Sequence, residues 1–213
     1  MADEIVLYTH PMSRGRIVRW MLEEIGQPYR TEVLDYGTTM KAPAYRAINP
    51  MGKVPAITHG GTVVTESPAI LAYLADAFPA AALAPRPGDK LRGPYYRWLF
   101  FAAGPLEAAA MDKALGVVVP EKMKGMAGYG SMADVLDTLE SAVKDRPYLV
   151  GNTFTAADLY LGAHLGWGMQ FGTIEKRAAF EIYYDRLKAR PAAIRANAID
   201  DKLIAENPMP PGG

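Results

Sequence analysis

An acid, a hydroxyl and a proline stand together at Glu66, Ser67 and Pro68, directly before a stretch in which apolar residues have helical spacing. Ser67 is predicted to cap this helix, with Pro68 in its first position, where a missing N–H costs nothing. The free N–H groups and partial positive charge of a helix N-terminus also suit a carboxylate ligand, and Glu66 can pair with an ammonium group. One turn can therefore either cap a helix or hold both charges of an amino-acid head group.

A second proline stands at the entrance of a short apolar strand, in the sequence Lys53, Val54, Pro55. A trans proline at the first residue of a strand is the common arrangement, because there its missing N–H leaves no gap in the ladder. In the alternative, a cis turn holds Val54 extended, so that its N–H and C=O can pair with a peptide ligand as an added strand. The residues by themselves leave both arrangements open.

The loop from Tyr8 to Arg16 is a third segment whose side chains could do chemistry. Its polar and aromatic residues are Tyr8, Thr9, His10, Ser13 and Arg14. A hydroxyl donor beside a cation and the positive end of a helix can stabilise an anion. Each residue also has an ordinary structural explanation, since Tyr8 fits a core, Ser13 a helix cap and Arg14 a solvated charge. A loop histidine mostly faces solvent, so His10 is assigned no role.

The elements that position these residues follow the order strand, helix, strand and then strand, strand, helix. Apolar periodicity predicts them at residues 5–9, 14–25, 29–34, 54–58, 62–65 and 68–78. Residues 35–47 are polar, with Gly and Pro, and predict a loop or short helix. His59, Gly60 and Gly61 have the length and composition of a tight hairpin turn.

The composition changes after this first set of elements. Residues 79–93 hold three prolines and two glycines among few large apolar residues, which is typical of a linker between domains. We expect one domain at 1–80, a linker at 81–90 and a second domain at 91–213. The patterns in the second domain are all helical, at 91–113, 131–144, 155–168, 176–189 and 192–206. Gly104 and Pro105 should bend or interrupt the first of these helices.

Composition also limits the classes of function. The 213 residues carry no formal net charge and no dense basic cluster, so neither nucleic acid nor a membrane is an expected partner. The absence of cysteine excludes disulfides, thiolate metal sites and a cysteine nucleophile. The three histidines, His10, His59 and His164, lack ligand spacing, and no metal site is expected. The N-terminal residues do not have the pattern of a secretory signal, which favours a cytoplasmic location.

Four stretches make the chain resemble the cytosolic glutathione transferases, from its first strand to its last helix. They are LYTHPMSRGRIVRWMLEE, NPMGKVPAI, ESPAIL and LVGNTFTAADLYL. The resemblance implies an α/β plus all-α fold, with an N-terminal thioredoxin-like domain, a cis bond between Val54 and Pro55, and an all-helical C-terminal domain. In the last stretch Thr155 and Asp158 predict a capping box, with Phe154 as its hydrophobic staple.

The resemblance also implies a binding site for the tripeptide glutathione. Val54, held by the turn at Pro55, pairs its backbone with the cysteinyl part of the tripeptide. Glu66 and Ser67 hold the γ-glutamyl head group, and Lys53 lies near the glycyl carboxylate. The two ends of one short stretch would thus bind two parts of one ligand.

An enzyme of this kind must favour the glutathione thiolate over the thiol. A thiol pKa near 8.5 leaves only a few per cent thiolate at neutral pH, and lowering it by two units corresponds to about 2.7 kcal/mol. Ser13 is the first candidate for this role, because serine-type members of the family carry their hydroxyl just before the first helix. The alternative is Tyr8 with Arg14, at the positions of the tyrosine and arginine of tyrosine-type members.

The implied function is transfer of alkyl or aryl groups to glutathione, a detoxification chemistry in which the thiolate attacks an electrophilic carbon. The alternatives are glutathione-dependent reduction of peroxides or disulfides, and a nonenzymatic interaction domain, because a fold does not determine a function. Tyr95 and Met111 are candidates for the wall of the electrophile pocket, although aromatic residues at helical spacing are often core. Family members are usually twofold dimers, so a homodimer is expected.

Overall fold

The computed structural model describes residues 3–206, which divide into two units. Residues 3–81 and 190–206 belong to the first unit, and residues 82–189 form the second. The first segment of unit one ends at residue 81, and the linker at 81–90 stays a prediction. The division differs at the C-terminus, because the last helix groups with the first unit instead of the helical one.

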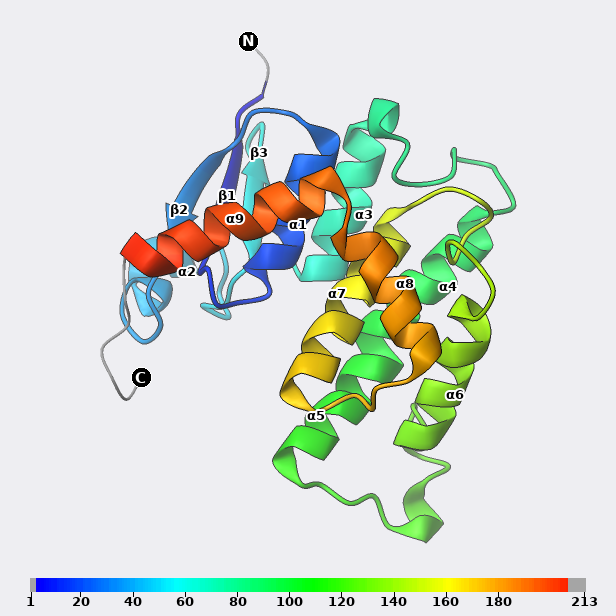
Figure 1. Ribbon diagram of the computed structural model, residues 1–213. Helices are drawn as coiled ribbons and strands as arrows, with labels where there is room; N and C mark the ends of the chain where they lie inside the picture. Colours follow the sequence, from blue (N-terminus) through cyan, green and yellow to red (C-terminus); the bar gives the residue numbers. More distant parts are fainter. Residues whose placement is uncertain (1–2, 207–213) are drawn as a thin grey trace. The chain divides into compact units, whose positions relative to one another are not determined.

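A four-stranded sheet forms the centre of the first unit (Figure 1). Its strands are β1 (Ile5–Thr9), β2 (Arg30–Val33), β3 (Ala56–His59) and β4 (Thr62–Thr65). The spatial order is β2-β1-β3-β4, with β1 parallel to β2 and antiparallel to β3. The hairpin between β3 and β4 is confirmed, and Gly60 and Gly61 supply the positive φ values of its turn. This sheet, with its helices, confirms the predicted thioredoxin-like domain.

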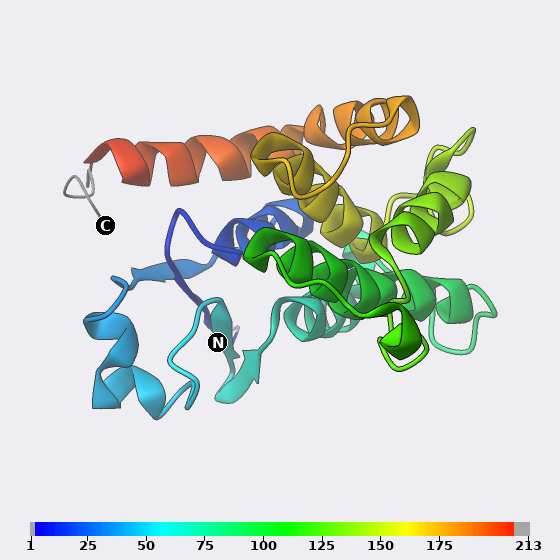
Figure 2. The same cartoon turned by 90° about the horizontal axis from the view of Figure 1, so that it is seen from below.

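Two helices of the first unit, α3 (Ser67–Ala77) and α9 (Pro191–Glu206), pack against α1 (Gly15–Ile25). The unit also contains η1 (Thr39–Lys41), α2 (Pro43–Arg46) and η2 (Pro79–Ala81). α1 buries Ile17, Val18, Met21 and Leu22 and contacts β1, α3 and α9. Figures 1 and 2 both show α9 running alongside α1. A helix that is amphipathic in sequence thus becomes covered on two sides.

A buried ion pair links α9 to α1. The Arg19 Nε atom donates to Asp200 Oδ1 at 2.9 Å, and the side chains are 1% and 0% exposed. Nη1 of Arg19 also donates to the hydroxyls of Tyr29 and Thr31, at 3.3 and 3.1 Å. Burial raises the pKa of Asp200, and the Arg19 charge opposes this shift. A buried charge is retained only with a partner, so this pair explains why the last helix belongs to the first unit.

The second unit is helical throughout the part of the chain that the structure describes. Its elements are α4 (Arg92–Phe101), η3 (Ala102–Leu106), α5 (Glu107–Leu115), η4 (Glu121–Met123), α6 (Met132–Val143), α7 (Ala156–Phe171) and α8 (Ala178–Lys188). The interruption predicted at Gly104 and Pro105 is confirmed, because both lie in η3, a π-helical turn between α4 and α5. α7 contacts both α4 and α8 and is buried on most of its surface.

The capping box predicted at the start of α7 is confirmed. Asp158 Oδ2 accepts hydrogen bonds from the Thr155 N–H and hydroxyl, at 2.8 and 2.9 Å. Oδ1 accepts from the Leu149 N–H and from the Tyr183 hydroxyl, both at 2.7 Å. Phe154 is buried, and its ring packs against the ring of Tyr148. Asp158 therefore joins the preceding loop and α8 to the start of α7.

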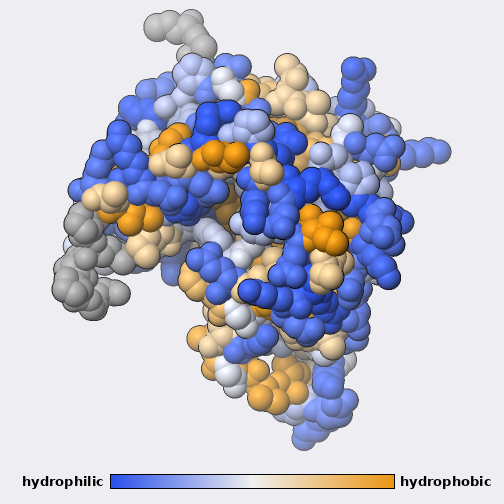
Figure 3. Space-filling model, in the orientation of Figure 1, coloured by the Kyte–Doolittle hydropathy of each residue, from blue (hydrophilic) through white to orange (hydrophobic). Residues whose placement is uncertain are grey.

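The surface of the described residues is mainly hydrophilic on the face shown in Figure 3, where apolar residues form separate groups. Scattered apolar side chains of this kind are ordinary on protein surfaces. Between residues 3 and 206, none of the helices combines the length and apolar character that crossing a membrane requires.

Candidate functional site

The three candidate segments converge at one end of the sheet. Tyr8 on β1 pairs with Ala56 on β3, and Ala56 pairs with Thr65 on β4, so these residues form a row across the sheet. The loop that carries Ser13 follows β1 directly. The Val54–Pro55 turn precedes Ala56, and Glu66 follows Thr65. Strand register therefore brings together residues that are more than fifty positions apart in sequence.

Ser13 is held tightly at the start of α1. Its hydroxyl donates to the His10 carbonyl at 2.6 Å and accepts from the Gly15 N–H at 3.0 Å. The side chain is buried, while Arg14, the N-cap residue of α1, is exposed. A ligand anion near this helix start would compete with the His10 carbonyl for the Ser13 proton. The arrangement can thus supply a hydroxyl donor together with the partial positive charge of a helix.

Gly15 permits this close packing because it lacks a side chain. A Cβ atom at residue 15 would lie 1.8 Å from Thr9 Oγ1 and 3.0 Å from Ser13 Oγ. Thr9 is fully buried and cannot move aside into solvent. The glycine therefore lets the first turn of α1 lie directly against the end of β1, which sets the position of Ser13.

Replacing Gly15 with alanine should destabilise the protein by about 1–3 kcal/mol, because the added methyl group overpacks a buried contact. Chemical denaturation measures the loss. Gly93→Ala is the matched control, because its Cβ would meet nothing within 4 Å on α4, and it should be neutral or slightly stabilising. Adding Thr9→Ala to Gly15→Ala should recover part of the loss. Unchanged stability in Gly15→Ala would contradict this account of the loop.

Tyr8, the alternative candidate, is half-buried on β1. Its ring lies 5.6 Å from the ring of Tyr45 and packs on the apolar cluster of Met40, Tyr45 and Ala56. Within residues 3–206 no hydrogen bond to its hydroxyl is found. Tyr8 thus combines a core position with a hydroxyl that a ligand could engage.

Tyr36 is a residue of this site that sequence reasoning missed. Its ring lies 4.4 Å from the ring of His10. Burial raises the pKa of Tyr36, while the Arg14 charge and a hydrogen bond with the Ser13 side chain oppose the shift. Burial also lowers the pKa of His10, against the nearby charge of Asp35. The available signal was an aromatic residue in a mainly polar loop, which also holds Tyr45, and its neighbours could not be predicted from it.

The segment before β3 is fixed by hydrogen bonds to its backbone. The carbonyl of Lys53 accepts from the Tyr45 hydroxyl at 2.6 Å and from the Asn49 side chain at 2.7 Å. Burial raises the pKa of Tyr45 to about 12, which keeps this hydroxyl a donor at neutral pH. The bond between Val54 and Pro55 is cis, as the resemblance implied. Val54 is half-buried, and the Lys53 side chain is exposed.

The start of α3 differs from the expected cap. Ser67 was predicted to cap this helix, and this prediction is wrong. α3 begins at Ser67 itself, and Glu66 occupies the N-cap position without a side-chain cap hydrogen bond. The reason is the backbone of Glu66, whose φ of 67° and ψ of 119° turn the chain into the helix one residue earlier. This conformation is strained for a non-glycine residue, and such strain is concentrated at functional sites.

Neither side chain of this turn has a hydrogen-bond or ion-pair partner in the described part of the chain. Ser67 is buried and Glu66 is exposed. The free N–H groups at the start of α3, the Ser67 hydroxyl and the Glu66 carboxylate therefore remain available together. They can bind a carboxylate and an ammonium group side by side.

The two candidates for the electrophile pocket lie in the second unit and differ in exposure. Tyr95 on α4 is fully buried and packs against the ring of Tyr96, whereas Met111 on α5 is 43% exposed. Their part in a pocket stays a prediction. Among residues 3–206, no group of three or more His, Asp or Glu side chains is arranged to hold a metal ion.

Comparisons with known proteins match segments in both units of the chain. The family model described as "Glutathione S-transferase, N-terminal domain" matches residues 12–77, and the one for the C-terminal domain matches residues 109–167. The chain is 31% identical to glutathione S-transferase GstA of Escherichia coli O157:H7 over 167 residues, 76% of this chain and 78% of that protein.

Solved structures give the same result. A glutathione transferase crystal structure from Methylococcus capsulatus is similar at 30% identity and a TM-score of 0.77, covering 93% of this chain and 99% of that one. A sphingomonad glutathione S-transferase complexed with glutathione is similar at 29% identity and a TM-score of 0.74, covering 92% and 98% of the two chains.

Proposed function

The chain belongs to the glutathione S-transferase family, and we propose that it binds glutathione where β1 ends and α3 begins, and presents its thiolate to an electrophile. The observation that carries this proposal is the turn at Glu66 and Ser67. A strained backbone there puts a carboxylate residue and a hydroxyl residue next to each other at the N-terminus of α3, where helix N–H groups are free. That set of groups matches the ammonium and carboxylate of a γ-glutamyl head group.

The remaining parts of the tripeptide fit the neighbouring segments. The backbone of Val54, beside the cis bond to Pro55, can pair with the cysteinyl residue as an added strand, which directs the ligand sulfur toward the loop after β1. The exposed ammonium of Lys53 can pair with the glycyl carboxylate. The glutathione complex of the sphingomonad relative supports the same ligand for this chain.

At the sulfur, Ser13 donates its proton to the thiolate in place of the His10 carbonyl. The Arg14 charge and the N-terminus of α1 add electrostatic stabilisation of the same anion. The thiol proton passes to solvent. The thiolate then forms a sulfur–carbon bond to the electrophile, whose leaving group departs with the bonding electron pair. Neither a metal nor a covalent enzyme intermediate takes part in this sequence. A cytoplasmic location and a homodimer stay predictions.

Binding of the tripeptide is tested by calorimetry with S-methylglutathione, which keeps both charged ends but has no thiol to ionise. We expect Glu66→Gln and Ser67→Ala each to weaken binding by about tenfold or more, because each loses a hydrogen bond to a charged group. Glu121→Gln, in the second unit, makes the same change of charge as Glu66→Gln and should leave affinity unchanged. Absence of binding by the unmodified protein, or equal affinities in all variants, would overturn the proposal.

A further inference from the structure

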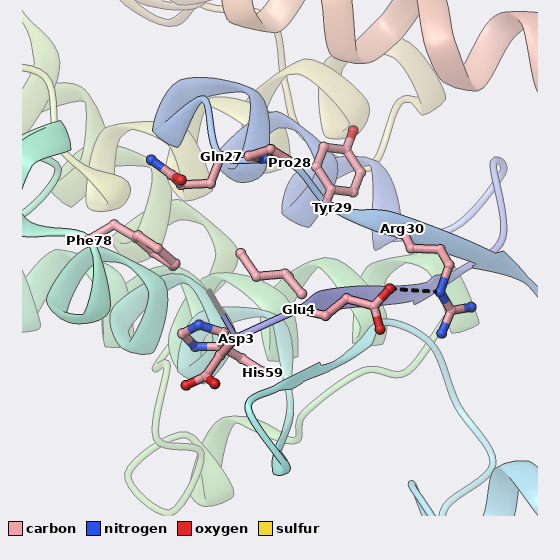
Figure 4. A pocket seen from close by; sticks show the side chains of 9 residues that line it. Asp3, Glu4, Gln27, Pro28, Tyr29, Arg30, His59 and Phe78 are labelled. Carbon is pink, nitrogen blue, oxygen red and sulfur yellow. Dashed lines mark hydrogen bonds and ion pairs between the residues drawn. The ribbon is translucent and has the colours of Figure 1, made fainter. Parts of the chain in front are cut away.

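A separate pocket of about 380 Å³ opens at the opposite end of the same sheet (Figure 4). Side chains from four parts of the chain line it, and those used below are Asp3, Glu4, Tyr29, Arg30, His59 and Phe78. Its volume lies within the range of small-molecule sites, which runs from about 300 to 1,000 Å³. All of these residues belong to the first unit.

Strand register separates this pocket from the proposed glutathione site. Ile5 at the start of β1 pairs with His59 at the end of β3, whereas Tyr8 pairs with Ala56 near the other end. At about 3.3 Å per residue, the length of β1 places the two ends roughly 13 Å apart. A ligand bound beside His59 therefore occupies a different site from one bound beside Ser13.

The pocket carries one uncompensated negative charge. Arg30 Nε donates to Glu4 Oε1 at 3.2 Å, the contact drawn as a dashed line in Figure 4, and the same guanidinium also pairs with Glu32. Asp3, by contrast, has no ion pair or hydrogen bond to any residue that the structure describes. The cation of the pocket is thus neutralised, while the Asp3 carboxylate can accept a new partner.

Aromatic rings form the apolar part of the pocket. The ring of His59 lies 5.3 Å from that of Phe78, and its Nδ1 atom is 2.9 Å from the Tyr73 hydroxyl, which fixes its orientation. Tyr29 offers the pocket its ring and not its hydroxyl, because the hydroxyl is already engaged. It donates to Glu23 at 2.9 Å and accepts from Arg19. Such rings can cover an apolar ligand body and attract a cation through their faces.

We propose that this pocket binds a small organic amine, in which an ammonium group is joined to an aryl or short alkyl body. The ammonium pairs with Asp3, and the apolar body lies against the rings of His59 and Phe78, which pack on each other at 5.3 Å. An anion is disfavoured by the two carboxylates. A metal ion is disfavoured because Glu4 is already engaged by Arg30, which leaves Asp3 as the single available acid of the pocket among residues 3–206.

Two-dimensional amide NMR with 2-phenylethylamine tests the proposal, with 2-phenylethanol as the uncharged probe of the same shape. The amine should shift the signals of Ile5, His59 and Phe78 with roughly millimolar affinity, and the alcohol should bind several-fold more weakly. Saturating S-methylglutathione should leave these shifts unchanged, because its site lies at the other end of the sheet. This readout does not depend on transferase activity.

Asp3→Asn should weaken binding of the amine about fivefold to tenfold, and Phe78→Leu should weaken both probes. Glu121→Gln is the control for net charge and should bind like the unmodified protein. Asp3 is exposed and unpaired in the described structure, so Asp3→Asn should fold normally, which circular dichroism checks. Equal binding of amine and alcohol, equal affinity in Asp3→Asn, or displacement of the amine by S-methylglutathione would each overturn the proposal.

Discussion

Replacing Ser13 with alanine is expected to lower kcat/KM for conjugation of glutathione to a chlorinated nitroaromatic by about 100-fold at neutral pH. Removing one preorganised hydrogen-bond donor to an anion in an active site lowers the rate by a factor of about 10²–10³. For a thiolate this appears as a rise of about two units in the pKa of the bound thiol. Titration of the thiolate absorbance of the complex measures that rise directly.

The structure supplies the controls for this experiment. Tyr8→Phe removes the competing hydroxyl and keeps the ring packed against Tyr45. Tyr36→Phe removes the hydroxyl beside Ser13 and keeps the ring contact with His10. We expect both variants to leave the thiol pKa within about half a unit. A large rise in Tyr8→Phe alone would assign the role to Tyr8, and no rise in any variant would contradict the whole assignment.

Ser13→Ala also removes the acceptor of the Gly15 N–H, so a structural effect must be separated from loss of the donor. The affinity for S-methylglutathione makes that distinction, because this ligand has no thiolate to stabilise. It should stay within about twofold in Ser13→Ala. A large loss of that affinity would mean that the loop, and not the hydroxyl proton, accounts for the lower rate.

Replacing Asp158 with alanine is expected to destabilise the protein by about 4 kcal/mol. Within residues 3–206 its carboxylate accepts hydrogen bonds from two N–H groups and two hydroxyls, and it is fully buried. Burial raises the pKa of Asp158, and these hydrogen bonds oppose the shift. The truncation leaves buried donors without a partner at Leu149, Thr155 and Tyr183, each of which costs about 1–3 kcal/mol.

α6 offers a matched control for Asp158. Ser131 and Asp134 form the same capping box there, with the Asp134 N–H donating to Ser131 Oγ at 3.1 Å and the Ser131 N–H donating to Asp134 Oδ2 at 3.0 Å. Asp134 is exposed, so Asp134→Ala should cost only about 1 kcal/mol. Denaturant unfolding compares the two variants. Equal losses would show that the buried bonds to Leu149 and Tyr183 contribute little.

Much of the fold was predictable because its signals are local. Apolar periodicity located β1 and α1, the two glycines after His59 marked the hairpin, and Pro105 marked the break between α4 and α5. The capping box at Thr155 was readable for the same reason, since its partners are three residues apart. Residue type and position before a helix marked Ser13 and Glu66 as candidates, and the resemblance to family motifs gave them their roles toward glutathione.

Other features required the tertiary structure. Ser67 was expected to cap α3, but the positive φ of Glu66 starts the helix one residue earlier, and no pattern of side chains encodes that backbone strain. Tyr36 reached Ser13 only because the loop after β2 folds back beside the loop after β1. Neither the backbone conformation of Glu66 nor the contact between Tyr36 and Ser13 has a periodic or short-range signature in the sequence.

The sequence by itself determined the strands, the helices, the hairpin and the capping box, since each depends on residues within a few positions of one another. Only the tertiary structure decided that the last helix joins the first unit, through a buried pair between Arg19 and Asp200. It also places the pocket beside His59 at the opposite end of β1 from the proposed glutathione site. The physical reason is that a buried charge or a cavity is defined by groups distant in the chain, whose proximity depends on packing and strand register.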